Sequence, residues 1–234
     1  MIHPSPILRF SSNIVCILAI LSAGNLCAQQ TNPNAPKKDF RPSGIRIATD
    51  LFTLVRSPLD ETFSGWEAAV DIDFYRYYVT IERGQWQRDL KSADETYAND
   101  GAYWRAGVDV NFLKKDPEKN MVFLGFRYGW SSFDESLTLI LDDTWNTGTT
   151  DYSNTNASAS WGEITGGLRV KIWKMFWLGY TARYKFALNT NADSNLLPYD
   201  VPGYGRTDTS ATWGFNYYVL FRIPVRKTSA LPKQ

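Results

Sequence analysis

Apolar and polar residues alternate along most of the chain from Gly44 onward, and this two-residue period predicts β-strands. Between residues 122 and 130, large apolar side chains occupy the even positions, while Gly125, Arg127 and Gly129 fall among the odd ones. Eight segments follow the pattern, at 45–55, 66–74, 77–86, 102–112, 122–130, 163–172, 176–188 and 213–223. The pattern therefore predicts an all-β fold.

The lengths of these segments and of their connections narrow the fold class. Most segments hold about 10 residues, close to the ~9–11 that a tilted strand needs to cross a bilayer and longer than the ~5–6 typical of soluble domains. Short connections at 75–76, 113–120 and 173–175 alternate with long ones at 56–65, 87–101, 131–162 and 189–212. We predict an eight-stranded antiparallel up-and-down transmembrane β-barrel, with its short turns in the periplasm and its long loops outside the cell.

The N-terminal segment resembles a secretory signal peptide. Arg9 is followed by an apolar run at residues 14–21, and small residues precede a cleavage point that we place after Ala28. We therefore divide the chain into a signal peptide (1–28), a periplasmic linker (29–43), an outer-membrane barrel (44–225) and a C-terminal tail (226–234). The chain contains no apolar run of the ~20 residues that a membrane helix requires.

Cleavage would remove both cysteines, Cys16 and Cys27, and the only histidine, His3. Without Arg9, the mature chain has 24 basic and 24 acidic residues, which argues against a nucleic-acid partner. A nucleophile activated by imidazole cannot be built without histidine, and a zinc site needs histidine or cysteine. We therefore expect no catalytic residues, no cofactor and no metal site.

The polar faces of the predicted strands combine charged residues with glycines. A narrow barrel interior favours small residues beside long ones, so we assign these faces to the lumen and the apolar faces to lipid. We expect a closed lumen filled by ion pairs. The predicted interior charge network consists of Glu67, Asp71, Asp73, Glu82, Arg105, Asp109, Arg127, Glu163, Arg169, Arg183 and Lys185.

The apolar faces carry aromatic residues near the strand ends, as expected of girdles at the two membrane boundaries. Trp66, Trp104, Trp130 and Trp213 are examples. One residue breaks the pattern, because Arg83 falls on the apolar face of its strand. Either a bulge shifts the register there, or the side chain of Arg83 extends to the outer interface.

The long connection 189–212 contains a proline- and tyrosine-rich segment. We expect this segment to cap the barrel mouth, with contact to a protein partner or surface glycan as the alternative. The candidate residues are Pro198, Tyr199, Pro202, Gly203, Tyr204 and Arg206.

Three stretches resemble an uncharacterised outer-membrane β-barrel family of Bacteroidota, a domain of unknown function. They read GFRYGWSSF at 125–133, PYDVPGYGR at 198–206 and WGFNYY at 213–218. The resemblance runs from Gly44 to about Pro224 and implies a fold and a location but no reaction. The predicted architecture is similar to the small eight-strand barrels typified by the OmpA transmembrane domain and OmpX.

We expect a non-enzymatic outer-membrane protein with a structural or interaction role through its extracellular loops. Its expected partners are outer-membrane lipid and lipopolysaccharide, the barrel-assembly machinery during biogenesis and an unidentified envelope protein. One alternative is a soluble periplasmic, lipocalin-like barrel that binds an apolar ligand. Another is a lipid-modifying outer-membrane enzyme that uses carboxylates or tyrosines.

Overall fold

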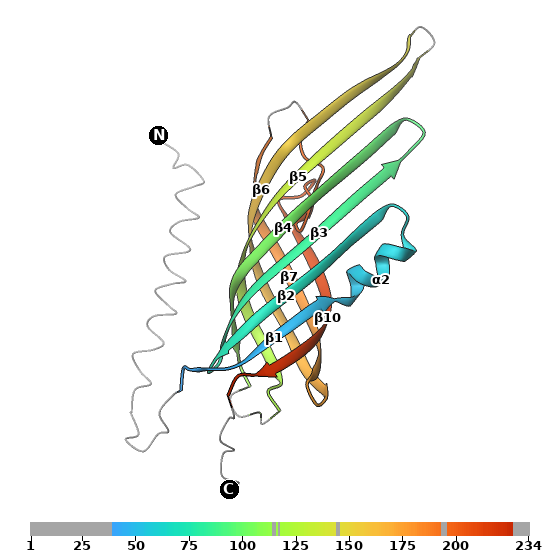
Figure 1. Ribbon diagram of the computed structural model, residues 1–234. Coiled ribbons are helices and arrows are strands. Elements are labelled where there is room, and N and C mark those ends of the chain that lie inside the picture. The colour runs from blue at the N-terminus through green and yellow to red at the C-terminus, as the bar shows by residue number, and fades with distance from the viewer. Residues whose placement is uncertain (1–38, 114–115, 117, 144–145, 193–195, 227–234) are drawn as a thin grey trace, which may run out of the picture. The chain divides into compact units, whose positions relative to one another are not determined.

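The computed structural model describes residues 39–113, 116, 118–143, 146–192 and 196–226, and its strands close into an antiparallel ring (Figure 1). The ring order is β1-β10-β7-β6-β5-β4-β3-β2, so each wall strand lies beside its neighbours in the sequence and β1 closes on β10. The wall strands are β1 (Pro42–Asp50), β2 (Phe63–Phe74), β3 (Tyr77–Lys91), β4 (Glu95–Asn111), β5 (Met121–Asp143), β6 (Asn146–Trp173), β7 (Phe176–Asn191) and β10 (Ala211–Pro224). The predicted eight-stranded up-and-down topology is confirmed.

Some predicted features lie outside the described residues. They are the signal peptide with its cleavage point, the linker up to residue 38 and the tail from residue 227. Across the ranges that the structure describes, no helix has both the length and the apolar character needed to cross a membrane.

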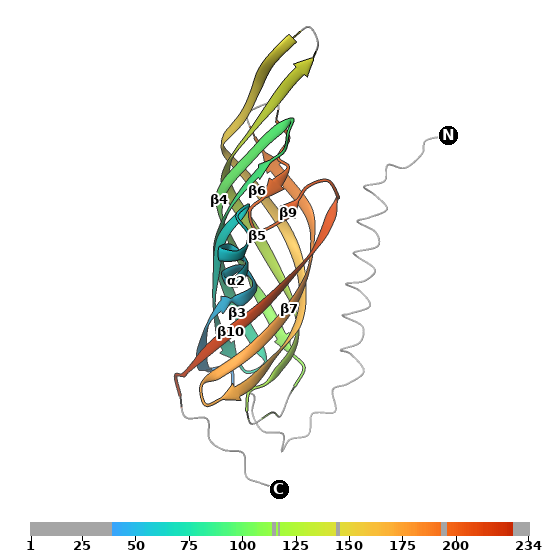
Figure 2. The ribbon, with the colours of Figure 1, turned by 90° about the vertical axis from the view of Figure 1, so that its right-hand side faces the viewer.

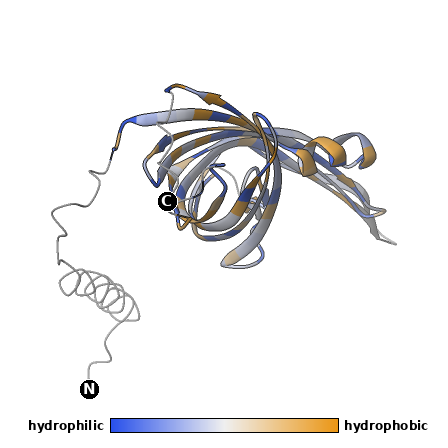
Figure 3. Ribbon diagram, turned by 90° about the horizontal axis from the view of Figure 1, so that it is seen from below, coloured by the Kyte–Doolittle hydropathy of each residue, from blue (hydrophilic) through white to orange (hydrophobic). Residues whose placement is uncertain are grey.

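The strand pattern places the apolar faces outside the ring and the charged faces inside it. Phe126 is 53% exposed, whereas its neighbour Arg127 is 1% exposed. The same contrast holds on β7, where Tyr184 lies outside beside the buried Arg183. Seen along the barrel, hydrophobic and hydrophilic positions alternate around the wall (Figure 3). The core of this fold thus lies in the lumen, where buried ion pairs lie beside three clusters of buried hydrophobic side chains.

Arg83 lies on the outer face without a break in register. It pairs with Ala68 of β2 and with Trp104 of β4 in uninterrupted ladders, so the bulge considered from the sequence is not present. The guanidinium carbon of Arg83 lies 4.8 Å from the centroid of the Trp104 ring, within cation–π range.

The first predicted strand is wrong in its second half. Residues 51–55 begin a helix, α2 (Leu51–Leu59), because Asp50 caps it. The Asp50 carboxylate accepts hydrogen bonds from the backbone N–H of Thr53 at 3.2 Å and from its hydroxyl at 2.5 Å. A short apolar run such as LFTLV does not distinguish strand from helix by its period.

The early end of β1 leaves a gap in the upper wall that α2 covers. The last pairs of β1 are Asp50 with Tyr218 and Thr49 with Ala68, although β2 and β10 continue beyond them. In Figure 1, α2 continues from the end of β1, and it contacts both β2 and β10. Its apolar side chains are exposed, including Leu59 at 78%.

Two of the predicted long loops are mainly strand. The β3–β4 ladder continues to the pair Lys91–Thr96, and the β5–β6 ladder continues to Asp143–Asn146. These hairpins extend well past the closed part of the ring (Figures 1 and 2). The sequence pattern missed them because their strands are mostly polar and bury only scattered apolar residues such as Tyr97, Phe133 and Ala157, so no continuous hydrophobic alternation marks them.

The turn after α2 is fixed by the Asp60 carboxylate. It accepts hydrogen bonds from the Thr62 hydroxyl at 2.6 Å and from the Arg56 Nε at 2.9 Å. These donors, the Thr62 hydroxyl first, lower the pKa of Asp60 to about 2. Because this pKa lies below the ordinary value of ~3.9, the contribution of Asp60 is present above that value and is lost as the pH falls through about 2.

We expect Thr62→Val to raise the pKa of Asp60 toward its ordinary value, because the variant loses the hydroxyl donor. A carboxyl-carbon NMR titration of the refolded protein measures this pKa. The matched variant Thr155→Val alters an exposed threonine of β6 and should leave the Asp60 titration unchanged. An unshifted midpoint in Thr62→Val would contradict the assignment.

Candidate functional site

The upper half of the lumen contains a cluster in which arginines and glutamates alternate. Arg105 Nη2 lies 2.5 Å from Glu67 Oε2, and Arg105 Nε lies 2.7 Å from Glu82 Oε2. Arg183 contacts Glu163 at 2.9 Å and Glu82 at 3.0 Å. These side chains come from β2, β3, β4, β6 and β7, so the cluster links five wall strands across the lumen.

A second cluster fills the lower half. Asp71 is held between Arg46 at 2.7 Å and Arg169 at 2.5 Å. Asp109 pairs with Arg127 at 2.7 Å, and Arg127 also contacts Glu82 at 3.4 Å. Arg127 therefore joins the lower cluster to the upper one, and the ion pairs form one network along the lumen.

The network closes at the end of the barrel opposite the long hairpins. Asp73 accepts hydrogen bonds from the backbone N–H groups of Ser43 at 2.6 Å and Gly44 at 2.8 Å. Arg222 of β10 contacts the same carboxylate at 3.1 Å. These bonds fasten the start of β1 to β2 and β10.

The structure brings the residues of the predicted charge network together inside the ring. All of them are buried: Glu67, Asp71, Asp73, Glu82, Arg105, Asp109, Arg127, Glu163, Arg169, Arg183 and Lys185. Lys185 differs from the others in its partners. Its ammonium group donates to the carbonyl oxygens of Gly203 and Tyr204, each at 2.8 Å, and it has no carboxylate within 4.0 Å among the residues described.

The network also includes residues that we did not assign to it from the sequence. Arg46 and Arg222 are ion-pair partners, and two tyrosines donate to Glu67, with Tyr103 at 2.6 Å. Arg46 was recognisable, because it lies on the polar face of its strand. The tyrosines were not, because the sequence alone does not show that their hydroxyls reach a carboxylate.

Glycines on the polar faces make room for this network. A Cβ on Gly84 would lie 2.2 Å from the Tyr103 ring, and one on Gly125 would lie 2.0 Å from Asp109 Oδ1. The predicted role of these glycines as space for large lumen side chains therefore holds at both positions.

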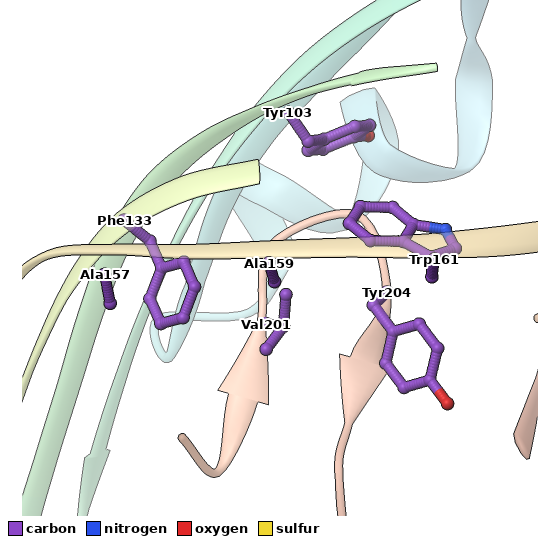
Figure 4. Close-up of a cluster of buried hydrophobic side chains, with 7 residues drawn as sticks. All are labelled: Tyr103, Phe133, Ala157, Ala159, Trp161, Val201 and Tyr204. Atoms are coloured by element: carbon purple, nitrogen blue, oxygen red, sulfur yellow. The ribbon is translucent and has the colours of Figure 1, made fainter. Parts of the chain in front are cut away.

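A hairpin from the connection 189–212 closes the upper mouth. It consists of β8 (Asp200–Val201) and β9 (Gly205–Arg206). Val201 and Tyr204 pack on Tyr103, Phe133 and Trp161 (Figure 4). Asp200 is also held by Arg88 at 2.8 Å. The expected cap is present, and we call this hairpin, residues 200–206, the plug.

The six candidate contact residues of this connection differ in burial. Four of them are buried: Pro198, Pro202, Gly203 and Tyr204. The other two remain outside, where the Arg206 guanidinium carbon lies 5.1 Å from the centroid of the Tyr199 ring. Only these two side chains are accessible to a partner.

The outer surface changes from apolar to polar along a row of residues that are paired in register across neighbouring strands. Arg83, Trp104, Trp130, Ser160 and Asn189 are register partners from β3 to β7. The adjoining outer positions toward the barrel wall proper are apolar, such as Ile81 and Tyr128, and those toward the hairpins are polar, such as Ser132 and Ser158. A hollow of about 710 Å³ lies over this transition.

Aromatic side chains gather at both ends of the apolar surface. Trp66, Trp104, Trp130 and Trp213 are exposed toward the hairpin end. At the other end the Trp173 and Phe176 rings stack at 6.3 Å, and Phe176 meets Phe221 at 5.4 Å. The two groups bracket the apolar band.

Each lumen carboxylate of the network accepts hydrogen bonds from guanidinium, hydroxyl or backbone donors. Within the described ranges no group of three histidine, cysteine, aspartate or glutamate residues is placed to hold a metal ion.

The sequence profile of a family described as "Domain of unknown function (DUF6048)" matches residues 7–228. No curated protein shows a significant match to the chain. Among solved structures, the chain is similar to Neisserial surface protein A (NspA), with 11% identity and a TM-score of 0.38, over 78% of this chain and 94% of that one. It is also similar to CarO of Acinetobacter baumannii, with 11% identity and a TM-score of 0.38, over 79% of this chain and 98% of that one.

We expect Arg105→Met to destabilise the barrel by about 3–5 kcal/mol, because it removes the guanidinium that pairs with the buried carboxylates of Glu67 and Glu82. The measurement is urea unfolding of the refolded protein in detergent micelles, followed by the shift between folded and unfolded bands on an unboiled gel. Arg41→Met removes an exposed arginine and serves as the control, with an expected change within about 0.5 kcal/mol. Equal stabilities of the two variants would refute the role given to the network.

Proposed function

We propose that this chain, which belongs to the DUF6048 family of domains of unknown function, is a barrel that spans the bacterial outer membrane and acts through its outer hairpins without catalysis of its own. The observation that carries the proposal is the inverted polarity of the wall, with apolar side chains outside and ion pairs inside. A protein that folds in water buries its apolar face, whereas a barrel in lipid exposes it.

The height of the apolar band supports a bilayer as its surroundings. On β7 the outward apolar residues run from Phe176 to Phe186, ten residue steps of ~3.4 Å. At a strand tilt of about 40° this corresponds to roughly 26 Å along the barrel axis, close to the ~25 Å band of outer-membrane barrels. The two groups of exposed aromatic residues lie where the head groups of such a bilayer would begin.

The lumen argues against a channel. Its cross-section is occupied by the ion-pair network, and the plug covers the upper mouth, held by the Lys185 and Arg88 contacts. What remains available for interaction is the outer end, where the β3–β4 and β5–β6 hairpins project (Figure 2). A structural or adhesive role at the cell surface fits this layout, with lipopolysaccharide and an envelope protein as partners.

The soluble, lipocalin-like alternative requires an apolar lumen. Here the lumen contains a network of buried arginines, aspartates and glutamates beside three smaller clusters of buried hydrophobic residues, and the apolar faces of the strands point outward. No observation favours that alternative. For the enzymatic alternative, unchanged lipid A mass spectra in a deletion strain would count against catalysis, and a modified spectrum would overturn this part of the proposal.

The orientation can be measured by cysteine labelling on intact cells. We expect Thr149→Cys, at an exposed position of the β5–β6 hairpin, to react with a membrane-impermeant maleimide. Met175→Cys, in the short turn between β6 and β7, should react only after the outer membrane is permeabilised. The removal of Cys16 and Cys27 with the signal peptide would leave no competing thiol.

A reversed pattern, in which Met175→Cys reacts on intact cells and Thr149→Cys does not, would contradict the proposal. Reaction of both sites only after permeabilisation would contradict it as well. Release of the protein by osmotic shock without detergent would also contradict it, because a membrane-spanning barrel stays with the membrane. A folded band that migrates differently on an unboiled gel provides the check that the labelled variants retain the barrel.

A further inference from the structure

Arg83 is a cation on the outer wall that no protein group neutralises. No carboxylate lies within 4.0 Å of it among the residues that the structure describes, and its recorded contact is with the Trp104 ring at 4.8 Å. By contrast, each guanidinium of the lumen network pairs with a carboxylate. An anion from outside the chain would complete this position.

The hollow beside Arg83 is built from small polar residues. Ser132, Ser158 and Ser160 line its floor together with Ala102, and Asn189 and Asn191 line its far side. Trp104 and Trp130 form its edge toward the apolar band. Hydroxyl and amide groups donate and accept hydrogen bonds, and indole rings are common at membrane boundaries. The hollow thus offers a cation, hydrogen-bonding groups and flat rings side by side.

The extent and direction of the hollow limit what can fill it. It crosses β3 to β7, and five strands at ~4.8 Å spacing span about 19 Å. Because the strands tilt, the row from Arg83 to Asn189 runs obliquely, from the edge of the apolar band toward the polar hairpins. A phosphate and glycerol would occupy only the Arg83 end, whereas a phosphorylated sugar head group would also reach the serines and asparagines.

We propose that this hollow binds the phosphorylated sugar head group of an outer-leaflet glycolipid. Its phosphate lies against the Arg83 guanidinium, its sugar hydroxyls meet Ser132, Ser158 and Asn189, and its acyl chains continue along the apolar wall below Trp130. The inference rests on the proposed location in the outer membrane and adds a site to it. An arginine suits this position because its planar group stacks on Trp104 while donating to phosphate oxygens.

The test measures lipid binding by native mass spectrometry on the full mature protein, refolded in detergent micelles. The probes are bis-phosphorylated lipid A, its fully dephosphorylated form and phosphatidylglycerol. We expect lipid A to bind the unaltered protein about tenfold more tightly than either other probe. Arg83→Gln should lower lipid A affinity about tenfold, since a charge-assisted contact of this kind corresponds to about that factor.

Two further variants distinguish the effect of the Arg83 charge from the effect of the shape of the hollow. Ser158→Trp fills the hollow and leaves Arg83 in place, so we expect it to weaken lipid A binding while the fold, followed on an unboiled gel, stays intact. Arg41→Gln removes an exposed arginine away from the hollow and should change the affinity by less than twofold. Both altered wall positions are on the outer surface, so neither substitution disturbs the lumen network.

The outcomes are distinct. Equal lipid A affinity in Arg83→Gln and the unaltered protein overturns the site, as does equal binding of dephosphorylated lipid A. Phosphatidylglycerol binding as tightly as lipid A overturns the assignment of a sugar head group. If the cysteine labelling supports a membrane-spanning barrel while these measurements fail, the site alone is refuted; if the labelling fails, the location falls and the site with it.

Discussion

Charges enclosed by a narrow ring of strands must be paired, and this requirement governs the rest of the structure. An unpaired ion removed from water costs far more than any single contact returns. The lumen satisfies the requirement by alternating arginine with glutamate and aspartate across facing strands, so that Arg105 and Arg183 each reach more than one carboxylate. Because each pair links different strands, the network also fixes how the strands are arranged around the ring.

Large side chains and the plug occupy much of the lumen. Several large lumen side chains lie over a glycine of the neighbouring strand, as Tyr103 does over Gly84. The plug completes the closure at the mouth with aromatic packing and with two carbonyl oxygens bound by Lys185. The projecting hairpins and the outer wall remain exposed.

The sequence predicted the ring, its strand order and the identity of the lumen face, because a two-residue period survives wherever an apolar face points outward and the other face meets a packed interior. The prediction from the sequence failed in segments where the two faces of the strand do not differ clearly in polarity. Residues 51–55 are apolar on a segment too short to show a period, and the cap formed by Asp50 decides for a helix. The outer part of β6 is mostly polar, and in the outer part of β5 Ile140 falls out of alternation with Leu137 and Leu139, so the continuous register reveals these segments as strands. The tyrosine contacts of Glu67 depend on three-dimensional proximity, which no spacing encodes.

Arg83 is informative because the wall strands around it otherwise alternate strictly between outward apolar and inward polar side chains. A charge on the lipid face costs ~2–4 kcal/mol at the midplane of a bilayer and ~0–1 kcal/mol near its boundary. In the proposed membrane, its position beside Trp104 at the edge of the apolar band lies near the boundary, where the free-energy cost of a charge is lower, so the arginine is tolerated. Tolerance does not account for the hollow, however, because a side chain that only extends toward water needs no row of serines and asparagines beside it. Because these residues are small, a region about five strands wide contains few protein atoms. In the proposed membrane, lipid would fill this region. The coincidence of an unpaired cation with a polar hollow at the boundary is what distinguishes a binding surface from a tolerated charge.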